Sequence, residues 1–322
     1  MVVSEKNFFS IIMPVYNKEN YVEDAIISVL NQTFKNFELI IVCDPSTDNS
    51  NKIVEEYKKI NKKIRIFYRD KPGPGGYAAR NLGIKKSKAN WIAFLDADDE
   101  WNKNHLEKIY KLIKLYPGIQ VFTCARKKVY SEKKKNTIDS FSDSQNKKHK
   151  LFTFEDYLYY CIHGKRAIGT NSIVVNKNVL SYDNWFPDGK TKRSGDYYLW
   201  VILLANAGKF VWSSHIGSIS YRSRSDVSKN NVPSVNINHE MVGRLESIIN
   251  QQELKLLKKY ANRLIRKAWF ENKRIGNKKK PLAYEFYWEN DIKYCLKWVI
   301  LSLLPYKFYQ IIYSIKYNLK ND

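Results

Sequence analysis

The sequence predicts an α/β fold in which helices flank a mostly parallel sheet and a helical extension follows at the C-terminal end. Three observations predict this class. Over about the first 125 of the 322 residues, apolar runs of strand length alternate with segments of helical periodicity. Only short links separate these segments, which favours parallel strands joined by right-handed crossovers. After Val232 the apolar pattern is helical to the last residue.

Short apolar runs bounded by polar or turn-forming residues mark the predicted strands. Residues 37–42 give the clearest example, because a run that is apolar except for Glu38 is typical of a strand buried on both faces. We expect Pro14 to end the first strand. The predicted strands are residues 9–13, 37–42, 64–68, 91–95, 119–124, 172–175, 210–212 and 218–221.

Predicted helices have apolar residues three or four positions apart, as at Val22, Ile26 and Val29. Thr47 or Asp48 is expected to cap the second helix. Residues 131–150 are polar and rich in lysine without a period, so we expect a mobile surface loop there. The predicted helices are residues 19–31, 48–60, 75–86 with a loop at their start, 104–115, 154–161 and 196–207.

The chain is strongly basic. Its 55 Lys and Arg residues against 32 Asp and Glu residues give a formal net charge of +23 at pH 7. A surplus of this size indicates an anionic partner, which could be nucleic acid, an acidic membrane surface or a phosphorylated substrate. A solvated, lysine-rich surface without such a partner is the alternative.

The C-terminal region mixes basic and aromatic residues. From residue 251 on, it holds 16 Lys and Arg residues and 6 Asp and Glu residues. Residues 298–306 are apolar but too few to span a bilayer. The surrounding aromatic and lysine side chains suit the interface of an anionic membrane, with a helix packed on the rest of the protein as the alternative. The aromatic residues are Tyr294, Trp298, Tyr306, Phe308, Tyr309 and Tyr313.

The four cysteines, Cys43, Cys124, Cys161 and Cys295, are scattered, with no Cys-x-x-Cys pair and no Cys/His group at zinc-binding spacing. This distribution favours free thiols in a reducing compartment. The first residues lack the features of a signal peptide, so we expect a cytoplasmic location. We expect His215 to lie on a strand surface rather than to bind a metal.

Polar residues follow three predicted strands at the edge where ligands bind in such sheets. Tyr16 follows the first strand, Asp44 the second, and Asp96 and Asp98 the fourth. The last two carboxylates would point to the same side of an extended segment. Hard cations such as Mg²⁺ or Mn²⁺ prefer oxygen ligands of this kind, although an acidic cap for the helix beginning near Asn104 is the alternative.

Several motifs occur in order along this half of the chain. They are IIMPVYNKENYVEDAIISVLNQTFKNFELIIV, CDPSTDNS, AARNLGI and WIAFLDADDEW. On these motifs the chain resembles the family 2 glycosyltransferases of the GT-A fold. The resemblance covers roughly the first 125 residues and extends more loosely to about Val227.

The resemblance implies an inverting transfer of a hexose or N-acetylhexosamine from a UDP-sugar to a saccharide acceptor. If the C-terminal region docks on a membrane, we expect this acceptor to be lipid-linked, on a polyprenyl carrier, as in bacterial surface-polysaccharide synthesis. Together with the basic C-terminal region, the resemblance implies peripheral attachment to the cytoplasmic face of the inner membrane. Residues 1–125 would bind the nucleotide-sugar, residues 126–232 would hold the acceptor and the catalytic base, and residues 233–322 would form a helical, basic, membrane-associated region.

The resemblance assigns the nucleoside to residues of the first two motifs. Tyr16 would lie against the base, with Pro14 and Asn17 shaping that pocket. Asp44 would accept the base N–H, which favours uridine. The family motif at this point is Asp-Asp-Gly-Ser, whereas this chain has Cys43-Asp44-Pro45-Ser46, so the first carboxylate and the glycine are missing.

The resemblance assigns binding of the diphosphate and the cation to residues of the later motifs. Arg80 would approach the diphosphate, Asp96 would hold the ribose or a metal-bound water, and Asp98 would bind Mn²⁺ or Mg²⁺ directly. Residues 72–76, Pro-Gly-Pro-Gly-Gly, either let the backbone approach the phosphates or only form a turn, and we favour the turn. Arg222 and Arg224 could hold the diphosphate or be exposed.

The segment SGDYYLW resembles the family motif that carries the catalytic base. Asp196 occupies the position of that base, and Gly195 replaces the usual preceding acid. From its position alone, Asp196 could instead be a helix N-cap, and the two roles are compatible.

A sugar nucleotidyltransferase, a nucleic-acid-binding protein and a non-catalytic family member are the alternatives. The nucleotidyltransferase would need a glycine-rich, basic activation loop after the first strand, which is absent. No nucleic-acid-binding motif is visible, so we expect no nucleic-acid partner. The altered motifs at Cys43, Pro45 and Gly195 leave the non-catalytic alternative open.

Overall fold

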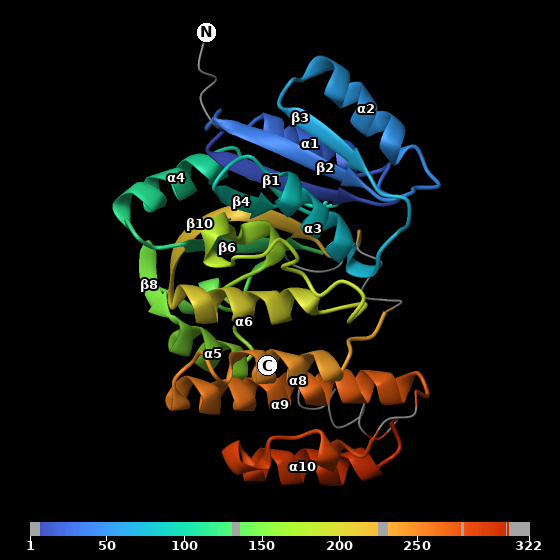
Figure 1. Ribbon diagram of the computed structural model, residues 1–322, viewed down its shortest axis with the longest axis vertical. Coiled ribbons are helices and arrows are strands. Elements are labelled where there is room, and N and C mark those ends of the chain that lie inside the picture. Colours follow the sequence, from blue (N-terminus) through green and yellow to red (C-terminus); the bar gives the residue numbers. More distant parts are fainter. Residues whose placement is uncertain (1–6, 131–135, 225–230, 278–279, 307, 309–322) are drawn as a thin grey trace.

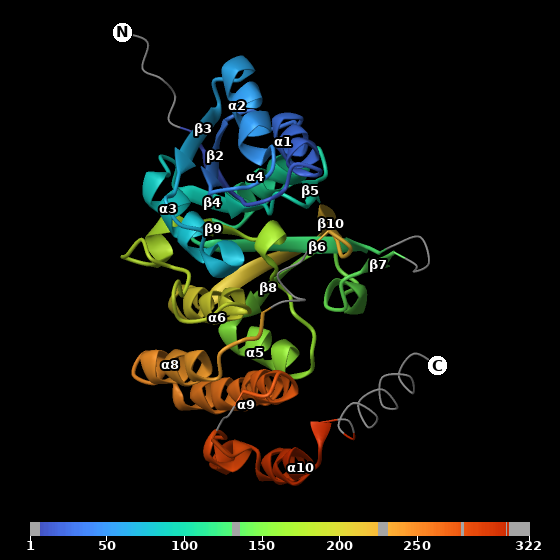
Figure 2. The same cartoon turned by 90° about the vertical axis from the view of Figure 1, so that its right-hand side faces the viewer.

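The computed structural model describes residues 7–130, 136–224, 231–277, 280–306 and 308. A curled sheet forms the upper part of the molecule in Figure 1, with helices on both of its faces. Further helices are stacked below it, and helix α10 (Ile292–Leu303) is outermost (Figures 1 and 2). The predicted α/β class with a helical C-terminal extension is confirmed.

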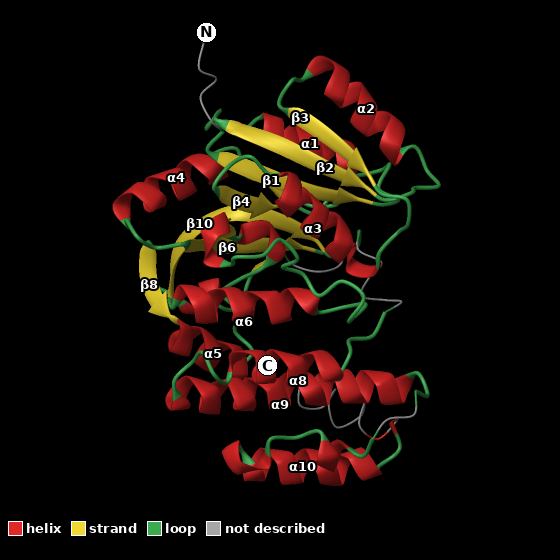
Figure 3. Ribbon diagram, viewed as in Figure 1, coloured by secondary structure: helices red, strands yellow, loops and turns green. Residues whose placement is uncertain are grey.

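One half of the sheet consists of four parallel strands in the order β3-β2-β1-β4 (Figure 3). Strand β1 continues through Pro14 to Val15, so the prediction that Pro14 ends it was wrong. Pairing with β4 stops at Phe94, opposite Ile12. The missing amide of Pro14 therefore falls beyond the β4 ladder and interrupts none of its hydrogen bonds. The strands are β1 (Phe9–Val15), β2 (Phe37–Cys43), β3 (Ile64–Tyr68) and β4 (Trp91–Phe94).

The other half of the sheet is mixed and continues the order as β9-β6-β10-β5. Strand β9 is antiparallel to both β4 and β6, whereas β6 and β10 are parallel. The two strands predicted at 210–212 and 218–221 are one strand, β10, whose pairing with β6 shifts register between Ser213 and Ser218. The strands are β5 (Glu100–Trp101), β6 (Val121–Val129), β9 (Val174–Asn176) and β10 (Lys209–Tyr221).

The predicted surface loop at 131–150 was wrong for residues 136–150, and residues 131–135 lie outside the described part. Strand β7 (Thr137–Ile138) pairs with β6, and β8 (His149–Thr153) pairs with β10. Between them Phe141 is fully buried against the rings of Phe152 and Trp212. The carboxylate of Asp139 accepts a hydrogen bond from the backbone amide of Arg126 at 2.9 Å. Two buried side chains thus fix a segment whose composition is that of a loop.

Alternate residues of β1 face opposite helix layers. Ile11 and Met13 belong to a core shared with α1, α2 and α4, whereas Ile12 belongs to one shared with α3, α5 and α6. The predicted helices are confirmed, with ends that differ by at most three residues. They are α1 (Val22–Leu30), α2 (Ser50–Ile60), α3 (Tyr77–Lys86), α4 (His105–Leu115), α5 (Phe154–Ile162) and α6 (Gly195–Ala207).

Within the described residues, the C-terminal part holds the α-helices α8 (Asn236–Leu245), α9 (Gln251–Arg274) and α10 (Ile292–Leu303). Helix α10 buries Cys295 and Trp298 toward α9, where the Trp298 ring packs on Phe270 and Arg266. Trp298 is therefore not the interfacial side chain that we predicted, and Tyr309 and Tyr313 lie outside the described residues. Among the described helices, none has the length and apolarity needed to cross a bilayer.

Candidate active site

The predicted site residues converge on one pocket, here called the strand-end pocket. It opens where β1, β2 and β4 end, and the first residues of α6 close one side of it. Seven of the eight predicted site residues line it. These are Pro14, Tyr16, Asp44, Arg80, Asp96, Asp98 and Asp196.

Asn17, the eighth, does not line the pocket but follows Tyr16 in the turn after β1. It has a left-handed backbone, with φ of 51°, and its side-chain oxygen accepts the amide of Thr47 at 2.8 Å. This bond ties the turn after β1 to the turn after β2. The ring of Tyr16 next to it is 47% exposed, which leaves a face open to a flat ligand.

Asp44 is buried and held from two sides. Its carboxylate accepts a charged hydrogen bond from Arg69 Nη1 at 2.5 Å and one from the amide of Gly73 at 3.0 Å. The sequence reasoning missed Arg69, because nothing in its position after β3 marks it. The bond to Gly73 attaches the Pro-Gly-Pro-Gly-Gly turn to the strand end. The turn also lines the pocket through Gly73, Gly75 and Gly76, so both predicted roles stay open.

Each of the two predicted acidic ligands is paired with a cation. Arg80 forms an ion pair with Asp96 and donates a second hydrogen bond to the carbonyl of Gly75 at 2.6 Å. Lys18 Nζ lies 2.7 Å from Asp98 Oδ2. Side chains of the protein thus neutralise the charges of these two carboxylates. Lys18 is a second functional residue, after Arg69, that the sequence analysis missed.

Carboxylate oxygens of Asp96, Asp98 and Asp99 lie within 4.8 Å of one another. Burial raises the pKa of Asp98, and the neighbouring Asp96 raises it further, against the effect of Lys18. Burial and the same two carboxylates raise the pKa of Asp99 to about 8. Crowded, partly desolvated oxygen donors of this kind fit a hard divalent cation such as Mn²⁺ or Mg²⁺.

Asp99 also connects the acidic cluster to its surroundings. It accepts hydrogen bonds from the side chain of Asn171 and from the amide of Tyr221 at 2.8 Å. The side-chain oxygen of Asn171 in turn accepts a hydrogen bond from the backbone amide of Asp96 at 2.8 Å. The end of β10 and the turn before β9 therefore fix the geometry of the cluster.

Asp196 is the second residue of α6, and Ser194 rather than Asp196 is the N-cap. It lines the strand-end pocket and also a second one, here called the adjoining pocket. Asp96 and Thr170 are the other residues common to both walls. Burial raises the pKa of Asp196, while the positive charges of Arg166 and Arg80 oppose this shift. A carboxylate with a raised pKa between two cavities suits a general base.

Basic side chains dominate the far wall of the adjoining pocket: Arg126, Lys128, Arg166 and Arg222. Arg126 is paired with Asp139 at 3.1 Å. Burial lowers the pKa of Lys128, and Arg222 and Arg126 lower it further, which reflects a local excess of positive charge. Arg224 instead packs over the Tyr221 ring at 3.6 Å and lies 3.5 Å from Glu100.

Comparison with known proteins identifies the family of this chain. The family model described as Glycosyl transferase family 2 matches residues 10–177, more than half of the chain. The chain belongs to glycosyl transferase family 2. The predicted membership is thereby confirmed.

Relatives and solved structures agree with this family. The putative teichuronic acid biosynthesis glycosyltransferase TuaG of Bacillus subtilis is 41% identical over 103 residues, which are 32% of this chain and 40% of TuaG. The aligned part of the chain therefore spans less than half of that relative. The crystal structure of S. aureus TarS 1-349 in complex with UDP-GlcNAc has a TM-score of 0.70 at 19% identity, covering 86% of this chain and 78% of that one.

A more distant neighbour is the mannosyltransferase PcManGT of Pyrobaculum calidifontis in complex with GDP-Man and Mn²⁺. Its TM-score is 0.51 at 12% identity, covering 97% of this chain and 81% of that one. At these identities the neighbours establish the fold, and the predicted GT-A fold is confirmed.

Packing explains one departure of this family 2 member from the usual motif. A Cβ atom on Gly195 would lie 2.7 Å from Pro187 and 2.9 Å from the ring of Tyr77. The amide of Gly195 donates to the Tyr77 hydroxyl at 2.8 Å. No acid fits at position 195, and Tyr77 occupies the space beside it. Cys43, a second departure, is fully buried in β2, so a carboxylate there would lack solvent.

Proposed function

We propose that the chain is an inverting glycosyltransferase that moves a hexose or N-acetylhexosamine from a UDP-sugar to a saccharide acceptor. One observation carries the proposal. Asp196 stands in the wall between the strand-end pocket and the adjoining pocket, beside the paired Arg80 and Asp96. Donor and acceptor bound in the two pockets would meet at the carboxylate that takes the proton.

The strand-end pocket offers each part of a UDP-sugar a suitable surface. The open face of Tyr16 would stack on the base, and Asp44 would accept its N–H. Arg80, which reaches both Asp96 and the glycine turn, would hold the diphosphate. The UDP-GlcNAc complex of the TarS neighbour supports a uridine donor.

Asp96 and Asp98 would hold Mn²⁺ or Mg²⁺, and the Mn²⁺ complex of PcManGT supports such an ion. Bound there, the cation would act as a Lewis acid toward the diphosphate oxygens. Lys18, which is paired with Asp98 here, would have to leave it for an ion to bind, and its ammonium group would then be available to a phosphate oxygen of the donor.

The proposed transfer is one in-line displacement. Asp196 removes the proton of the acceptor hydroxyl, and that oxygen forms the new bond to the anomeric carbon from the side of the adjoining pocket. The bond from the anomeric carbon to the diphosphate oxygen breaks, and its electron pair leaves with UDP, next to Arg80. A single displacement from the opposite side inverts the anomeric centre.

The charge of the adjoining pocket suits a polyprenyl-linked acceptor. Lys128, Arg166 and Arg222 face a cavity next to Asp196, and the diphosphate of such a lipid would bind to guanidinium and ammonium groups. The teichuronic acid assignment of TuaG supports a role in bacterial surface-polysaccharide synthesis. A panel of nucleotide-sugars, assayed for Mn²⁺-dependent release of UDP or GDP, tests the proposed donor class.

Replacing Tyr16 with alanine is expected to weaken UDP binding. Stacking of a base on an aromatic ring contributes roughly 1–3 kcal/mol, or about 5- to 150-fold in affinity. Isothermal calorimetry with UDP and Mn²⁺ measures the loss. The control is Tyr284→Ala, because Tyr284 is 80% exposed and belongs to a different region. Equal affinity of Tyr16→Ala and wild type would remove Tyr16 from the nucleoside site.

Peripheral attachment to the cytoplasmic face of the inner membrane is the second part of the proposal. The solvent side of α10 carries an apolar stripe at helical spacing, with Leu296 48%, Ile300 63% and Leu303 79% exposed. Lys293 and Lys297 lie in the same helix. Aliphatic residues on one side and lysines beside them suit an anionic membrane surface.

The double substitution Leu296→Ser with Ile300→Ser is expected to reduce co-flotation with anionic liposomes at least tenfold, because burying each leucine-sized side chain contributes roughly 1.5–3 kcal/mol. Flotation of the full chain with phosphatidylglycerol-containing vesicles measures it. Ile60→Ser is the control, since Ile60 is 80% exposed and ends α2, a helix at the opposite end of the molecule from α10 (Figure 1). If the double variant floats as well as wild type, α10 is not the attachment surface.

A further inference from the structure

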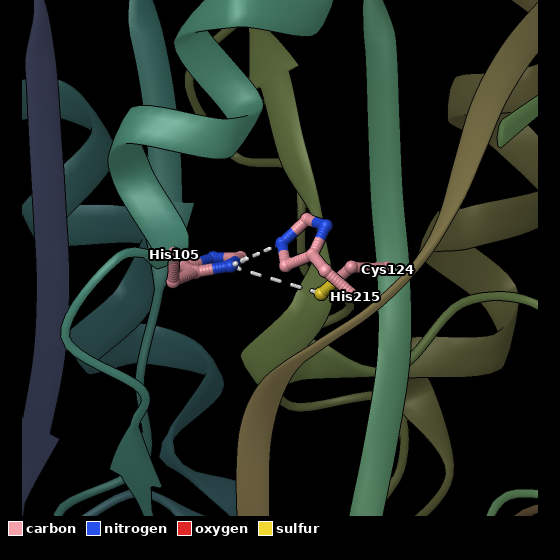
Figure 4. Close-up of side chains that lie close together, drawn as sticks. All are labelled: His105, Cys124 and His215. Atoms are coloured by element: carbon pink, nitrogen blue, oxygen red, sulfur yellow. Dashed lines mark hydrogen bonds between the residues drawn. The ribbon is translucent and has the colours of Figure 1, made fainter. Parts of the chain in front are cut away.

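Three metal-ligating side chains that are far apart in the sequence meet inside the protein, away from the acidic cluster. His105 is the first residue of α4, Cys124 lies in β6 and His215 lies in β10. Figure 4 shows their side chains pointing toward one another. His105 and Cys124 are fully buried, and one ligand atom from each of the three residues lies within 4.8 Å of the others. We predicted that His215 lies on a strand surface. This was wrong, because its side chain faces inward.

The hydrogen bonds within this cluster are long and compete with one another. His105 Nδ1 lies 3.3 Å from His215 Nε2 and 3.7 Å from Cys124 Sγ. A ring nitrogen carries either one hydrogen or one lone pair, so Nδ1 can make only one of these two bonds well. Cys124 Sγ also lies 3.9 Å from the carbonyl oxygen of Ser172. An ion bound by Nδ1, Nε2 and Sγ would replace these weak contacts.

The distances fit ligands around one four-coordinate ion. Zinc–nitrogen bonds of about 2.0–2.1 Å and zinc–sulfur bonds of about 2.3 Å put tetrahedral ligands roughly 3.3 Å (N···N) and 3.6 Å (N···S) apart. The corresponding distances here are 3.3 Å and 3.7 Å. Two imidazoles and a thiolate suit zinc, whereas magnesium and manganese prefer the oxygen ligands of the acidic cluster.

The surroundings of the cluster also suit an ion. His215 Nδ1 lies 2.9 Å from Ser213 Oγ, the kind of outer contact that orients a metal-binding imidazole and directs its other nitrogen to the ion. A side chain at Gly217 would collide with both His105 Nδ1 and Cys124 Sγ. Glycine at this position therefore keeps the space beside two of the ligand atoms open.

We propose that His105, Cys124 and His215 bind a zinc ion that fastens α4 to β6 and β10. Three protein ligands leave one position for water. Helix α4 begins only six residues after Asp99, so the ion would anchor the chain segment that follows the acidic cluster. This site is independent of the proposed glycosyltransferase reaction, and its role is structural.

Metal analysis of untagged protein from zinc-supplemented cells tests the proposal. The expected result is one zinc per chain in wild type and less than a tenth of that in Cys124→Ser and His215→Gln. Two matched controls keep the ion: Cys161→Ser, which changes a buried cysteine of α5, and Asp98→Asn, which changes only the acidic cluster. Zinc in wild type no higher than in Cys124→Ser would overturn the proposal, as would full retention in both ligand variants.

A second measurement applies even if the ligand variants fail to fold. Wild-type protein freed of metal is titrated with Co²⁺, whose bond to a thiolate gives a charge-transfer absorption in the near ultraviolet. A band that saturates at one equivalent and is displaced by zinc is expected. Absence of this thiolate band in the folded wild-type chain would overturn the proposal, whatever the activity of the protein.

Discussion

The variant Asp196→Asn is expected to lose turnover by roughly 10²- to 10⁴-fold, the usual contribution of a positioned general base. Asparagine keeps the size of the side chain but cannot take the acceptor proton. The strand-end pocket is otherwise unchanged, so UDP affinity should stay near the wild-type value. Single-turnover transfer assays and calorimetry on the same preparation separate the two effects.

The dependence of turnover on pH distinguishes a catalytic role of Asp196 from a purely structural one. Burial raises the pKa of Asp196 above the usual 3.8, and the base works only when deprotonated. Wild-type turnover therefore falls as the pH drops through this raised pKa, at a higher pH than for an ordinary aspartate, and the residual activity of Asp196→Asn lacks this limb. Asp183→Asn, at an exposed carboxylate, serves as control. Wild-type turnover by Asp196→Asn would assign the base to another group.

Chelation with EDTA is expected to reduce transfer to background, and Mn²⁺ or Mg²⁺ to restore it. The physical reason is the oxygen cluster of Asp96, Asp98 and Asp99, which lacks any nitrogen or sulfur donor that would favour zinc. Transfer is followed with radiolabelled donor before and after each addition. Zinc alone should not restore it, which separates this effect from the histidine–cysteine cluster. Full transfer in excess chelator would rule out a catalytic cation.

Two variants of one ion pair should shift manganese affinity in opposite directions. Asp98→Asn removes a ligand charge and weakens binding, whereas Lys18→Met removes the ammonium group 2.7 Å from Asp98 that competes with the ion. Electron paramagnetic resonance of free Mn²⁺ measures both affinities without nucleotide. Glu107→Gln, outside the site, is the control. Weaker binding by Lys18→Met would contradict the competition.

Much of the fold and of the strand-end pocket could be predicted, because both depend on local patterns. An apolar run such as residues 39–43 needs no distant partner to be recognised as a buried strand. Tyr16, Asp44 and Asp98 follow such strands directly, and parallel strands bring their carboxyl ends to one edge. The alternation of strands and helices therefore predicted where these side chains meet.

The residues that were missed act through long-range contacts. Lys18 and Arg69 pair with acids that lie 80 and 25 positions away, and the sequence around each is that of ordinary surface lysine and arginine. His105 and His215, 110 positions apart, meet only because β10 lies beside β6 and α4 packs near both. The fold of residues 136–150 was missed for the same reason. This segment is mostly polar, and the buried ring of Phe141 holds it through contacts with distant residues.

Tyr77 connects the two halves of the proposed reaction. Its ring would collide with any side chain at Gly75 in the glycine turn, and its hydroxyl accepts the amide that opens α6, one residue before Asp196. A single phenol therefore borders the glycine turn on one side and the first residue of α6 on the other. The donor side and the acceptor side of the proposed reaction thus share one rigid contact, so a substitution of Tyr77 would disturb both at once.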